Sequence, residues 1–216
     1  MIAKLTVETP GDLPCGPTRP TMADMTREDL GDGAWLELAE RWLDPADAST
    51  LMARMVATLP LRTELVTVFG KQRPQPRLTA WHADPQCVYR YSGLELEPSP
   101  WTPELASMRD RLTNELGVPF NSVLVNLYRD GADSMGWHAD DERAFGESPT
   151  IASVSLGAPR RFALRHRKTR KTREFSLGGG SLLVMGGTIQ NGWQHAVPKT
   201  TRTVGSRLNL TWRWFR

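Results

Sequence analysis

The chain has 216 residues and a net charge of +3, so it can form one domain with a sizeable core and is only mildly basic. Its composition excludes several classes of protein. No apolar run reaches membrane length, and Met1–Pro10 lacks the apolar segment of a signal peptide. Cys15 and Cys87 form no CxxC pair, which argues against a disulfide scaffold or a zinc ribbon. The sequence therefore predicts a cytoplasmic protein without a membrane anchor.

The first third of the chain predicts an arm followed by strands and helices. Residues 1–33 are rich in Pro, Gly, Thr and Asp and show little periodicity, so we expect a flexible N-terminal arm there and one domain over residues 34–216. AWLELAERWL, from Ala34, indicates one or two short strands. Asp44-Pro45 is typical of a helix start. The apolar face of this helix is Leu51, Met52, Met55, Val56 and Leu59.

A second helix is predicted to begin at Thr102-Pro103 and to end at Gly117. Between the two helices, TELVTVFGKQRPQPRLTAWH and QCVYRYSG indicate strands and loops. After Phe120 the chain consists of short β-rich runs: VLVNLYRDG, TIASVSLG, RRFALRHR, SLLVMGG and SRLNLTWRWF. Such a series without intervening helices favours an antiparallel sandwich or barrel with the two helices packed outside. We expect SVSLGAPRRFALR to form a hairpin that turns at or near residues 157–159.

An HxD motif is the first candidate for chemistry. Alternate residues of a strand share a face, so His138 and Asp140 can offer a nitrogen and an oxygen to one metal ion. His195, after the SLLVMGG strand, is the candidate third ligand. Two histidines and a carboxylate leave open positions, as in non-haem Fe(II) oxygenases, although zinc accepts the same ligands and a solvated strand end explains an isolated HxD. His166 is expected in a solvated basic strand, and His82 at the surface or a pocket rim.

The last strand, RLNLTWR, separates polar from apolar positions. Leu208, Leu210 and Trp212 share one face, and the polar residues share the other: Arg207, Asn209, Thr211 and Arg213. A buried face with two arginines needs an anion, and the planar fork of arginine suits a carboxylate. The pattern favours a dicarboxylate co-substrate such as 2-oxoglutarate, with Asn126 and Tyr128 as further donors from a neighbouring strand. The alternative is a solvated edge strand.

Taken together, these motifs resemble the AlkB-type 2-oxoglutarate- and Fe(II)-dependent dioxygenases, in particular their duplex-repair branch. The similar segments are NLYRDGADSMGWHADDE, IASVSLGAPRRFALR, GSRLNLTWR after His195, VFGKQRPQPR and YRYSGLELEPSPW. The resemblance spans Trp35 to the C-terminus. It implies an α+β, mainly β fold: a double-stranded β-helix, or jelly roll, over residues 121–216, preceded by helices and a nucleotide-recognition lid over residues 34–120.

The resemblance also implies roles for individual residues. The metal ligands would be His138, Asp140 and His195. The residues around 2-oxoglutarate would be Asn126, Tyr128, Arg207, Asn209, Thr211 and Arg213. Arg207 would bind the distal carboxylate, and Arg213 would lie nearer the metal and belong to the catalytic group with the three ligands.

The activity implied by the resemblance is oxidative dealkylation, with Fe(II), 2-oxoglutarate and O2 as cofactors. An N-methyl group of 1-methyladenine or 3-methylcytosine would be hydroxylated and lost as formaldehyde, with succinate and CO2 as the other products. We expect a monomer that repairs alkylated DNA, single- or double-stranded, with RNA as a further substrate. The alternatives are the same chemistry on modified tRNA, protein or a small molecule, and a nucleic-acid-binding module with an inert metal site.

Several residues are candidates for substrate recognition. Asp141 and Glu142 can complement a positively charged alkylated base, unless they are solvated or one pairs with Arg143. Because a base inside a duplex must be flipped out to reach buried iron, we expect pocket walls, for which Tyr89 and Tyr91 are the best candidates. Ser92 belongs to the same segment. Trp81, His82 and Trp137 are weaker candidates, and core packing explains the two tryptophans equally well. Phe69, at a predicted hairpin tip, is a candidate wedge or a core residue.

A basic run between residues 160 and 173 is the candidate phosphate contact, with a solvated hairpin as the alternative. Its members are Arg160, Arg161, Arg165, Arg167, Lys168, Arg170, Lys171 and Arg173. The loop after His195 carries only Lys199 and Arg202. Two cations are few for strong binding of duplex DNA, so the preference for single or double strands stays open.

Overall fold

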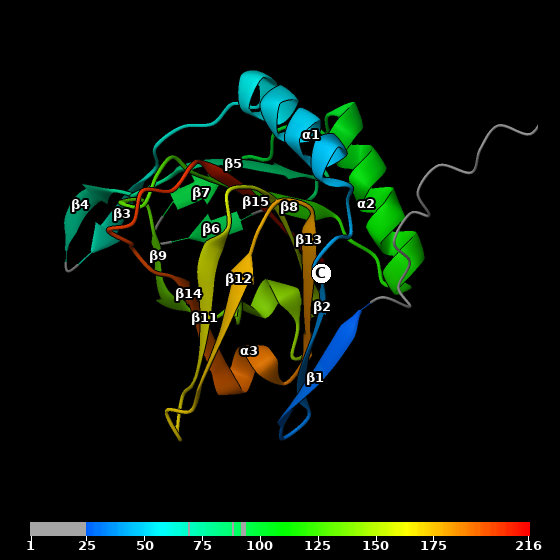
Figure 1. Ribbon diagram of the computed structural model, residues 1–216, viewed down its shortest axis with the longest axis vertical. Coiled ribbons are helices and arrows are strands. Elements are labelled where there is room, and N and C mark those ends of the chain that lie inside the picture. Colours follow the sequence, from blue (N-terminus) through cyan, green and yellow to red (C-terminus); the bar gives the residue numbers. More distant parts are fainter. Residues whose placement is uncertain (1–24, 69, 88, 92–93) are drawn as a thin grey trace, which may run out of the picture.

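Two antiparallel sheets facing each other form the main body of the protein (Figure 1). The computed structural model describes residues 25–68, 70–87, 89–91 and 94–216, with only the backbone of residues 68, 89–91 and 94–96. The larger sheet has seven strands, in the order β1 (Thr26–Gly31), β2 (Ala34–Ala39), β13 (Ser181–Gly187), β10 (Ile151–Gly157), β15 (Arg207–Arg213), β8 (Ser122–Tyr128) and β5 (Leu78–Ala83). The smaller sheet has four: β12 (Thr172–Leu177), β11 (Arg160–His166), β14 (Trp193–Val197) and β9 (Met135–His138).

Two short hairpins and three α-helices complete the described fold. The hairpins are β3 (Leu65–Val68) with β4 (Lys71–Pro74), and β6 (Tyr89–Tyr91) with β7 (Leu94–Leu96). The helices are α1 (Pro45–Thr58), α2 (Pro103–Leu116) and the single turn α3 (Ile189–Gly192). Figure 1 shows the β3–β4 hairpin on the side of the molecule opposite to β1. Among the described residues, no helix is long and apolar enough to cross a membrane.

The predicted jelly roll with two outer helices is confirmed by the packing of two apolar clusters. One cluster lies between the sheets and includes Ile151, Leu164 and Met185. The other joins α1 and α2 to the outer face of the larger sheet, through residues such as Met55 and Leu112. Figure 1 shows the two helices side by side along this sheet. The sheets can therefore hold polar residues between them only where a ligand or another polar group satisfies them.

The start of each long helix follows its predicted signal. Asp44 caps α1, whose first residue is Pro45, and its carboxylate accepts a hydrogen bond from the N–H of Ala46 at 2.8 Å. The Thr102 hydroxyl accepts the N–H of Leu105 at 3.3 Å. Gly117 ends α2 with φ at +66°, a conformation that a residue with a Cβ adopts at a cost.

The prediction of a flexible arm up to residue 33 is wrong for its last part. Strand β1 pairs antiparallel with β2, and the chain turns between them at Asp32, which has φ at +54°. Leu30 is buried in the cluster between the sheets, whereas the rest of TREDLG is polar because an edge strand exposes most of its side chains. One apolar residue in six gives no periodic signal, which is why the strand was missed. Residues 1–24 lie outside the described part of the chain.

The predicted hairpin around Gly157 is also wrong. Strand β10 pairs with β13 and β15 in the larger sheet, whereas β11 pairs with β12 and β14 in the smaller one. The chain therefore crosses from one sheet to the other at residues 157–159. Gly157 has φ at +84°, and a side chain there would collide with Met52 and with the carbonyl oxygen of Ser206. A glycine turn between two strands has the same sequence signal in both cases, so long-range packing decides the outcome.

Candidate active site

Three residues that can bind a metal converge between the sheets. His138 is the last residue of β9, Asp140 follows in the next loop, and His195 lies in β14, directly opposite His138 in the register. One ligand atom from each of the three lies within 4.8 Å of the other two. Asp140 reaches the site through the loop rather than through strand alternation, because β9 ends at His138. The three groups are close enough to hold one ion.

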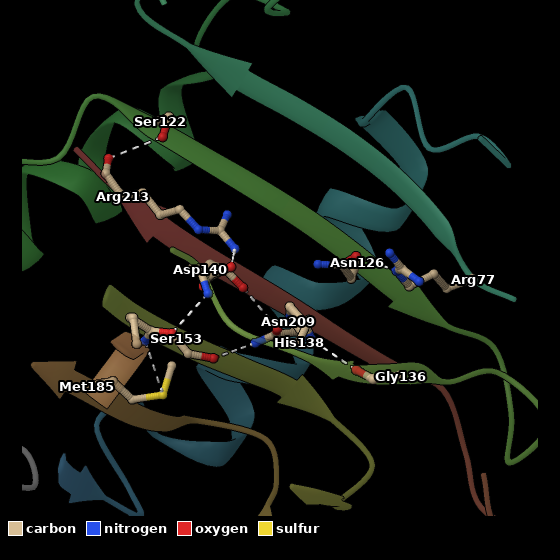
Figure 2. A network of polar contacts seen from close by, with 12 residues as sticks. Arg77, Ser122, Asn126, Gly136, His138, Asp140, Ser153, Met185, Asn209 and Arg213 are labelled. Atoms are coloured by element: carbon tan, nitrogen blue, oxygen red, sulfur yellow. Dashed lines mark hydrogen bonds and ion pairs between the residues drawn. The ribbon is translucent and has the colours of Figure 1, made fainter. Parts of the chain in front are cut away.

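The Asp140 carboxylate has one oxygen that a cation would satisfy. The Arg213 guanidinium donates from Nη2 to Asp140 Oδ1 at 2.8 Å, as Figure 2 shows. The Asp140 N–H donates to Gln190 Oε1 at 2.9 Å. Asp140 Oδ2 is buried and, within the described part of the chain, accepts no hydrogen bond. A buried carboxylate oxygen without a donor is costly, and coordination of a metal ion removes that cost.

The tautomer of His138 also suits a ligand. Its Nδ1 lies 2.9 Å from the carbonyl oxygen of Gly136, visible in Figure 2. A carbonyl can only accept, so Nδ1 carries the hydrogen and Nε2 presents a lone pair. A ligand histidine typically donates its other ring nitrogen to an oxygen in this way.

The protonation states of the three groups match those of metal ligands. Burial alone would raise the pKa of Asp140, but the Arg213 guanidinium and the two histidines lower it to about 2. Burial lowers the pKa of His195 to about 3, and it also lowers the pKa of His138. At neutral pH the site therefore holds an ionised carboxylate and two neutral imidazoles, which are the forms that bind metal.

The polar face of β15 lies inside the sandwich, as its alternation predicts. Leu208, Leu210 and Trp212 pack in the cluster under the helices, so the other residues of the strand point between the sheets. Arg207 is 1% exposed and donates from Nη2 to Ser155 Oγ at 2.9 Å. Its Nε and Nη1 have no partner in the described part of the chain, and burial lowers its pKa to about 10. A carboxylate is the ligand that such a guanidinium requires.

Two residues of β8 lie beside this strand, as predicted. Asn126 pairs with Asn209 in the register and Tyr128 pairs with Arg207, whose guanidinium carbon is 5.4 Å from the Tyr128 ring centroid. Asn209 donates to Ser153 Oγ at 2.8 Å, and the Thr211 hydroxyl donates to Asn209 Oδ1 at 3.2 Å. Asn209 and Thr211 are thus held by hydrogen bonds within the sheet.

Sequence reasoning missed two buried residues of the site. Arg77, just before β5, donates from Nε to Asn126 Oδ1 at 2.7 Å (Figure 2). Its signal in the sequence was an arginine at the start of the apolar run LTAWHA. Gln190, which holds Asp140, lies in a helix of four residues, too short for any periodic pattern.

The candidate recognition acids differ in their surroundings. Asp141 is exposed, and its Oδ2 accepts from Arg167 Nη2 at 2.6 Å, so its partner is Arg167 and not Arg143. Glu142 is half-buried beside it. Both acids follow the candidate ligand Asp140 directly in the same loop.

The residues predicted to form the walls of the base pocket differ in how far the structure describes them. Tyr89 and Tyr91 lie in β6, but their side chains, like Ser92 and Phe69, lie outside the described residues. Trp81 is buried against Phe215, with ring centroids 5.8 Å apart, which agrees with the core-packing alternative.

The expectation of a surface or pocket-rim position for His82 is wrong. His82 is 2% exposed, and its Nδ1 lies 2.7 Å from the carbonyl oxygen of Pro100. Trp137, the other weak candidate, is 40% exposed and lies under the Arg165 guanidinium, 4.3 Å from the ring centroid.

The basic run is a hairpin, β11–β12, and three of its six arginines form ion pairs. Arg161 binds Glu174, Arg167 binds Asp141, and Arg173 binds Glu28. In the described part of the chain, exposed cations without an ion pair remain at the turn of this hairpin: Lys168, Arg170 and Lys171.

The prediction of a phosphate contact is wrong for Arg160. This side chain is 3% exposed and donates to three carbonyl oxygens, those of Asp130 at 2.7 Å, Asp133 at 2.8 Å and Pro198 at 3.0 Å. The strand alternation turns it inward, where it ties two loops together.

The class of protein follows from this fold and site together with a match to a known family. Residues 36–213 match the 2OG-Fe(II) oxygenase superfamily, so the chain belongs to that superfamily, whose cofactors are Fe(II) and 2-oxoglutarate. Within it, similar proteins place the chain with the AlkB-type dioxygenases. A rat protein named alpha-ketoglutarate-dependent dioxygenase alkB homolog 3 is 37% identical over 80% of this chain and 61% of its own length.

Two proteins named DNA oxidative demethylase ALKBH2 are also similar. The mouse protein is 43% identical over 68% of this chain and 65% of its own length. The protein from Arabidopsis thaliana is 35% identical over 86% of this chain and 68% of its own length. The chain thus spans 61% and 65% of the first two relatives. A solved structure titled "The structure of OsALKBH1" shares the fold, with a TM-score of 0.62, 17% identity and coverage of 88% of this chain and all of the other.

Proposed function

We propose that the protein is an Fe(II)- and 2-oxoglutarate-dependent dioxygenase that removes N-linked alkyl groups from bases of DNA, and of RNA as a further substrate. The observation that carries this proposal is the convergence of His138, Asp140 and His195, with Arg213 bound to Asp140 and the buried Arg207 on the same inward face of β15. The names of the similar proteins, which include DNA oxidative demethylases, support the substrate class.

In this proposal each residue of the site has a defined task. His138, Asp140 and His195 would hold Fe(II), and a set of three protein ligands would leave the metal open to 2-oxoglutarate and O2. With Fe(II), 2-oxoglutarate and O2 bound, the site would supply the oxidation that turns the N-alkyl carbon into a hydroxyalkyl group, with succinate and CO2 as the products of 2-oxoglutarate. Arg213 keeps the Asp140 carboxylate ionised and directs Oδ2 toward the metal. Arg207 binds the distal carboxylate of 2-oxoglutarate.

Other polar residues of the sandwich support the co-substrate. Asn126 accepts from Arg77 through Oδ1, so its Nδ2 is available as a donor toward 2-oxoglutarate. Tyr128 lies beside Arg207 and adds a hydroxyl at the same end. Asn209 and Thr211 are fixed by hydrogen bonds within the sheet and shape the wall of the site.

Recognition of the base is assigned to the acids after the HxD motif. A base such as 1-methyladenine or 3-methylcytosine carries a positive charge, which Asp141 and Glu142 would complement. Asp141 shares its carboxylate with Arg167, so a cationic base competes with that guanidinium for it. We keep Tyr89, Tyr91 and Ser92 as pocket residues, Phe69 as the wedge and Arg161 as a phosphate contact.

One assay tests the proposal against both alternatives. The metal-free chain is reconstituted with Fe(II) and 2-oxoglutarate and given DNA and RNA oligonucleotides, single- and double-stranded, with 1-methyladenine or 3-methylcytosine. We expect formaldehyde and succinate in equal amounts, together with loss of the methyl group by mass spectrometry. Succinate formation that is indifferent to methylation would indicate another substrate for the same chemistry. No succinate, with oligonucleotide binding retained, would indicate an inert binding module.

A further inference from the structure

The short helix α3 contacts the loop that carries Asp140. It connects β13 to β14, and Ile189 and Gln190 within it are each 1% exposed. His195 follows Gln190 by five residues in the same continuous segment. One short stretch of chain therefore supplies a candidate metal ligand and borders another.

The main contact is a buried hydrogen bond. Gln190 Oε1 accepts the backbone N–H of Asp140 at 2.9 Å. A backbone N–H can only donate, so the orientation of the Gln190 amide is fixed by this contact. Both residues are buried, at 1% and 4% exposure, so water does not compete for either group. The Gln190 Nε2 lies 4.0 Å from Met185 Sδ, a weak acceptor, which leaves the Asp140 contact as the stronger of the two.

Two outer contacts hold the same loop to α3. The carbonyl oxygen of Gln190 accepts from Arg167 Nη2 at 3.4 Å, and the same guanidinium nitrogen binds Asp141 at 2.6 Å. The Asn191 amide donates to the carbonyl oxygen of Glu147 at 3.1 Å. These contacts are more exposed and contribute less. They show that α3 follows the loop from residue 140 to residue 147, with the buried Gln190 bond at the ligand itself.

We propose that Gln190 is a positioning residue for the metal, which sets how Asp140 presents its free oxygen. Arg213 fixes Oδ1 and Gln190 fixes the main chain of the same residue, so Asp140 can turn only Oδ2 toward the ion. The inference rests on the proposed assignment of His138, Asp140 and His195 as ligands. Loss of the Gln190 acceptor leaves a buried N–H unpaired, and the loop relaxes to satisfy it. That relaxation moves the ligand.

The test measures metal binding by the full chain, with Mn(II) alone as the probe, under argon and without 2-oxoglutarate. Gln190→Met removes the acceptor and keeps the length of the side chain. We expect its dissociation constant for Mn(II) to rise about 10–100-fold, the usual effect of losing an outer support of a ligand. Gln190→Glu keeps an oxygen in place and is expected to bind within about threefold of the wild type.

Gln194→Met is the matched control. Gln194 directly precedes His195 but lies on the opposite face of β14, where its Oε1 accepts from Arg165 Nη2 at 3.1 Å. The variant loses a comparable hydrogen bond next to a ligand without touching Asp140, so its Mn(II) affinity is expected to stay within about threefold. A role in stability alone would lower the thermal midpoint of the metal-free Gln190→Met protein without changing Mn(II) affinity, and that result overturns the proposal.

A further variant separates this inference from the ligand assignment. Asp140→Ala is expected to abolish Mn(II) binding, and wild-type affinity in Asp140→Ala would show that the proposed ligand set is wrong. Loss of binding in Asp140→Ala, with equal affinities in Gln190→Met and Gln194→Met, would show that only the positioning role is wrong. Should Gln190→Met not fold, Gln190→Asn withdraws the oxygen by one methylene group and is expected to show the same weakening. Wild-type affinity in folded Gln190→Asn likewise overturns the proposal.

Discussion

At the scale of single residues, Arg207 shows how a binding group conflicts with stability. Its guanidinium is buried between the sheets, and two of its nitrogens lack a partner among the described residues. Burial lowers its pKa to about 10, which reflects the cost of a charge away from water. A residue of this kind favours binding of an anion and opposes folding in its absence.

We therefore predict opposite effects for Arg207→Met. The free energy of binding of 2-oxoglutarate, measured by calorimetry with Mn(II) under argon, is expected to weaken by about 2–5 kcal/mol. This is the usual cost of removing one partner of a buried charge pair. The thermal midpoint without 2-oxoglutarate is expected to stay level or rise, because an unpaired buried charge has been removed. Arg161→Gln, which changes an exposed arginine, serves as the control and should alter neither quantity. Unchanged affinity in Arg207→Met would contradict the assigned role.

The acids after the HxD motif give a second prediction at this scale. The double variant Asp141→Asn/Glu142→Gln is expected to lose demethylase turnover on a cationic methylated base, because the charge complement is removed and the shape is kept. Metal content should stay at the wild-type level, since Asp140 is unchanged. Turnover is followed by formaldehyde release and metal by atomic absorption. Wild-type turnover with full metal content would exclude this recognition role.

At the scale of elements, Arg160 connects two loops rather than contacting a ligand. One loop lies between β8 and β9, and the other between β14 and β15; Thr200 N–H also donates to the carbonyl oxygen of Gly131 across them at 2.9 Å. The neighbouring Arg161, one position along the strand, points outward and pairs with Glu174. Two adjacent arginines in one basic run thus have different roles because strand alternation turns them to opposite faces.

This difference predicts different effects of two matched substitutions. Arg160→Gln is expected to reduce the free energy of unfolding by about 2–4 kcal/mol, because three backbone carbonyls lose a charged donor. The salt dependence of oligonucleotide binding should stay as in the wild type. Arg161→Gln should change stability by less than about 0.5 kcal/mol and reduce the slope of log affinity against log salt. Urea unfolding and salt titrations measure the two effects, and equal stability losses in both variants would contradict the assignment.

At the scale of the whole molecule, three histidines with lowered pKa values couple folding to pH. Burial is the main cause for His82, His138 and His195, and the value for His195 is about 3. Below the unfolded value of 6.5, the unfolded chain binds more protons than the folded one. Stability therefore falls as the pH decreases from 6.5, and for His195 the loss continues to about pH 3.

We predict that the metal-free protein becomes steadily less stable between pH 7 and pH 5. Each titrating group contributes up to about 1.4 kcal/mol per pH unit to the slope. His82→Gln removes one such group that is not among the candidate metal ligands, so its slope is expected to be smaller by up to that amount. Urea unfolding at pH 5, 6, 7 and 8 measures the slopes. Identical slopes in wild type and variant would contradict a neutral, buried His82.

Much of the fold was predictable because its signals are local. Asp44 and Thr102 mark helix starts, and the alternation in RLNLTWR fixes which side of β15 faces the site. What failed depends on distant partners. Strand β1 has one buried apolar residue, and the turn at Gly157 has the same local sequence whether the next strand stays in its sheet or changes to the other.

The candidate site divides in the same way. The spacing of the HxD motif made His138 and Asp140 candidates, the family resemblance added His195 as the third ligand, and the structure brings the three together. Gln190 and Arg77 were not identifiable, because their roles depend on contacts with residues 50 and 49 positions away in the sequence. No local pattern contains that information.

The two sheets contribute different halves of the site. His138 and His195 belong to the smaller sheet, whereas Arg207 and Arg213 belong to the larger one. A metal ion and a keto acid bound together would therefore link the two sheets. This link should make the two sheets unfold cooperatively, in a single step. It should also give the backbone amides between the sheets their strongest protection from hydrogen exchange when the metal ion and the keto acid are both bound.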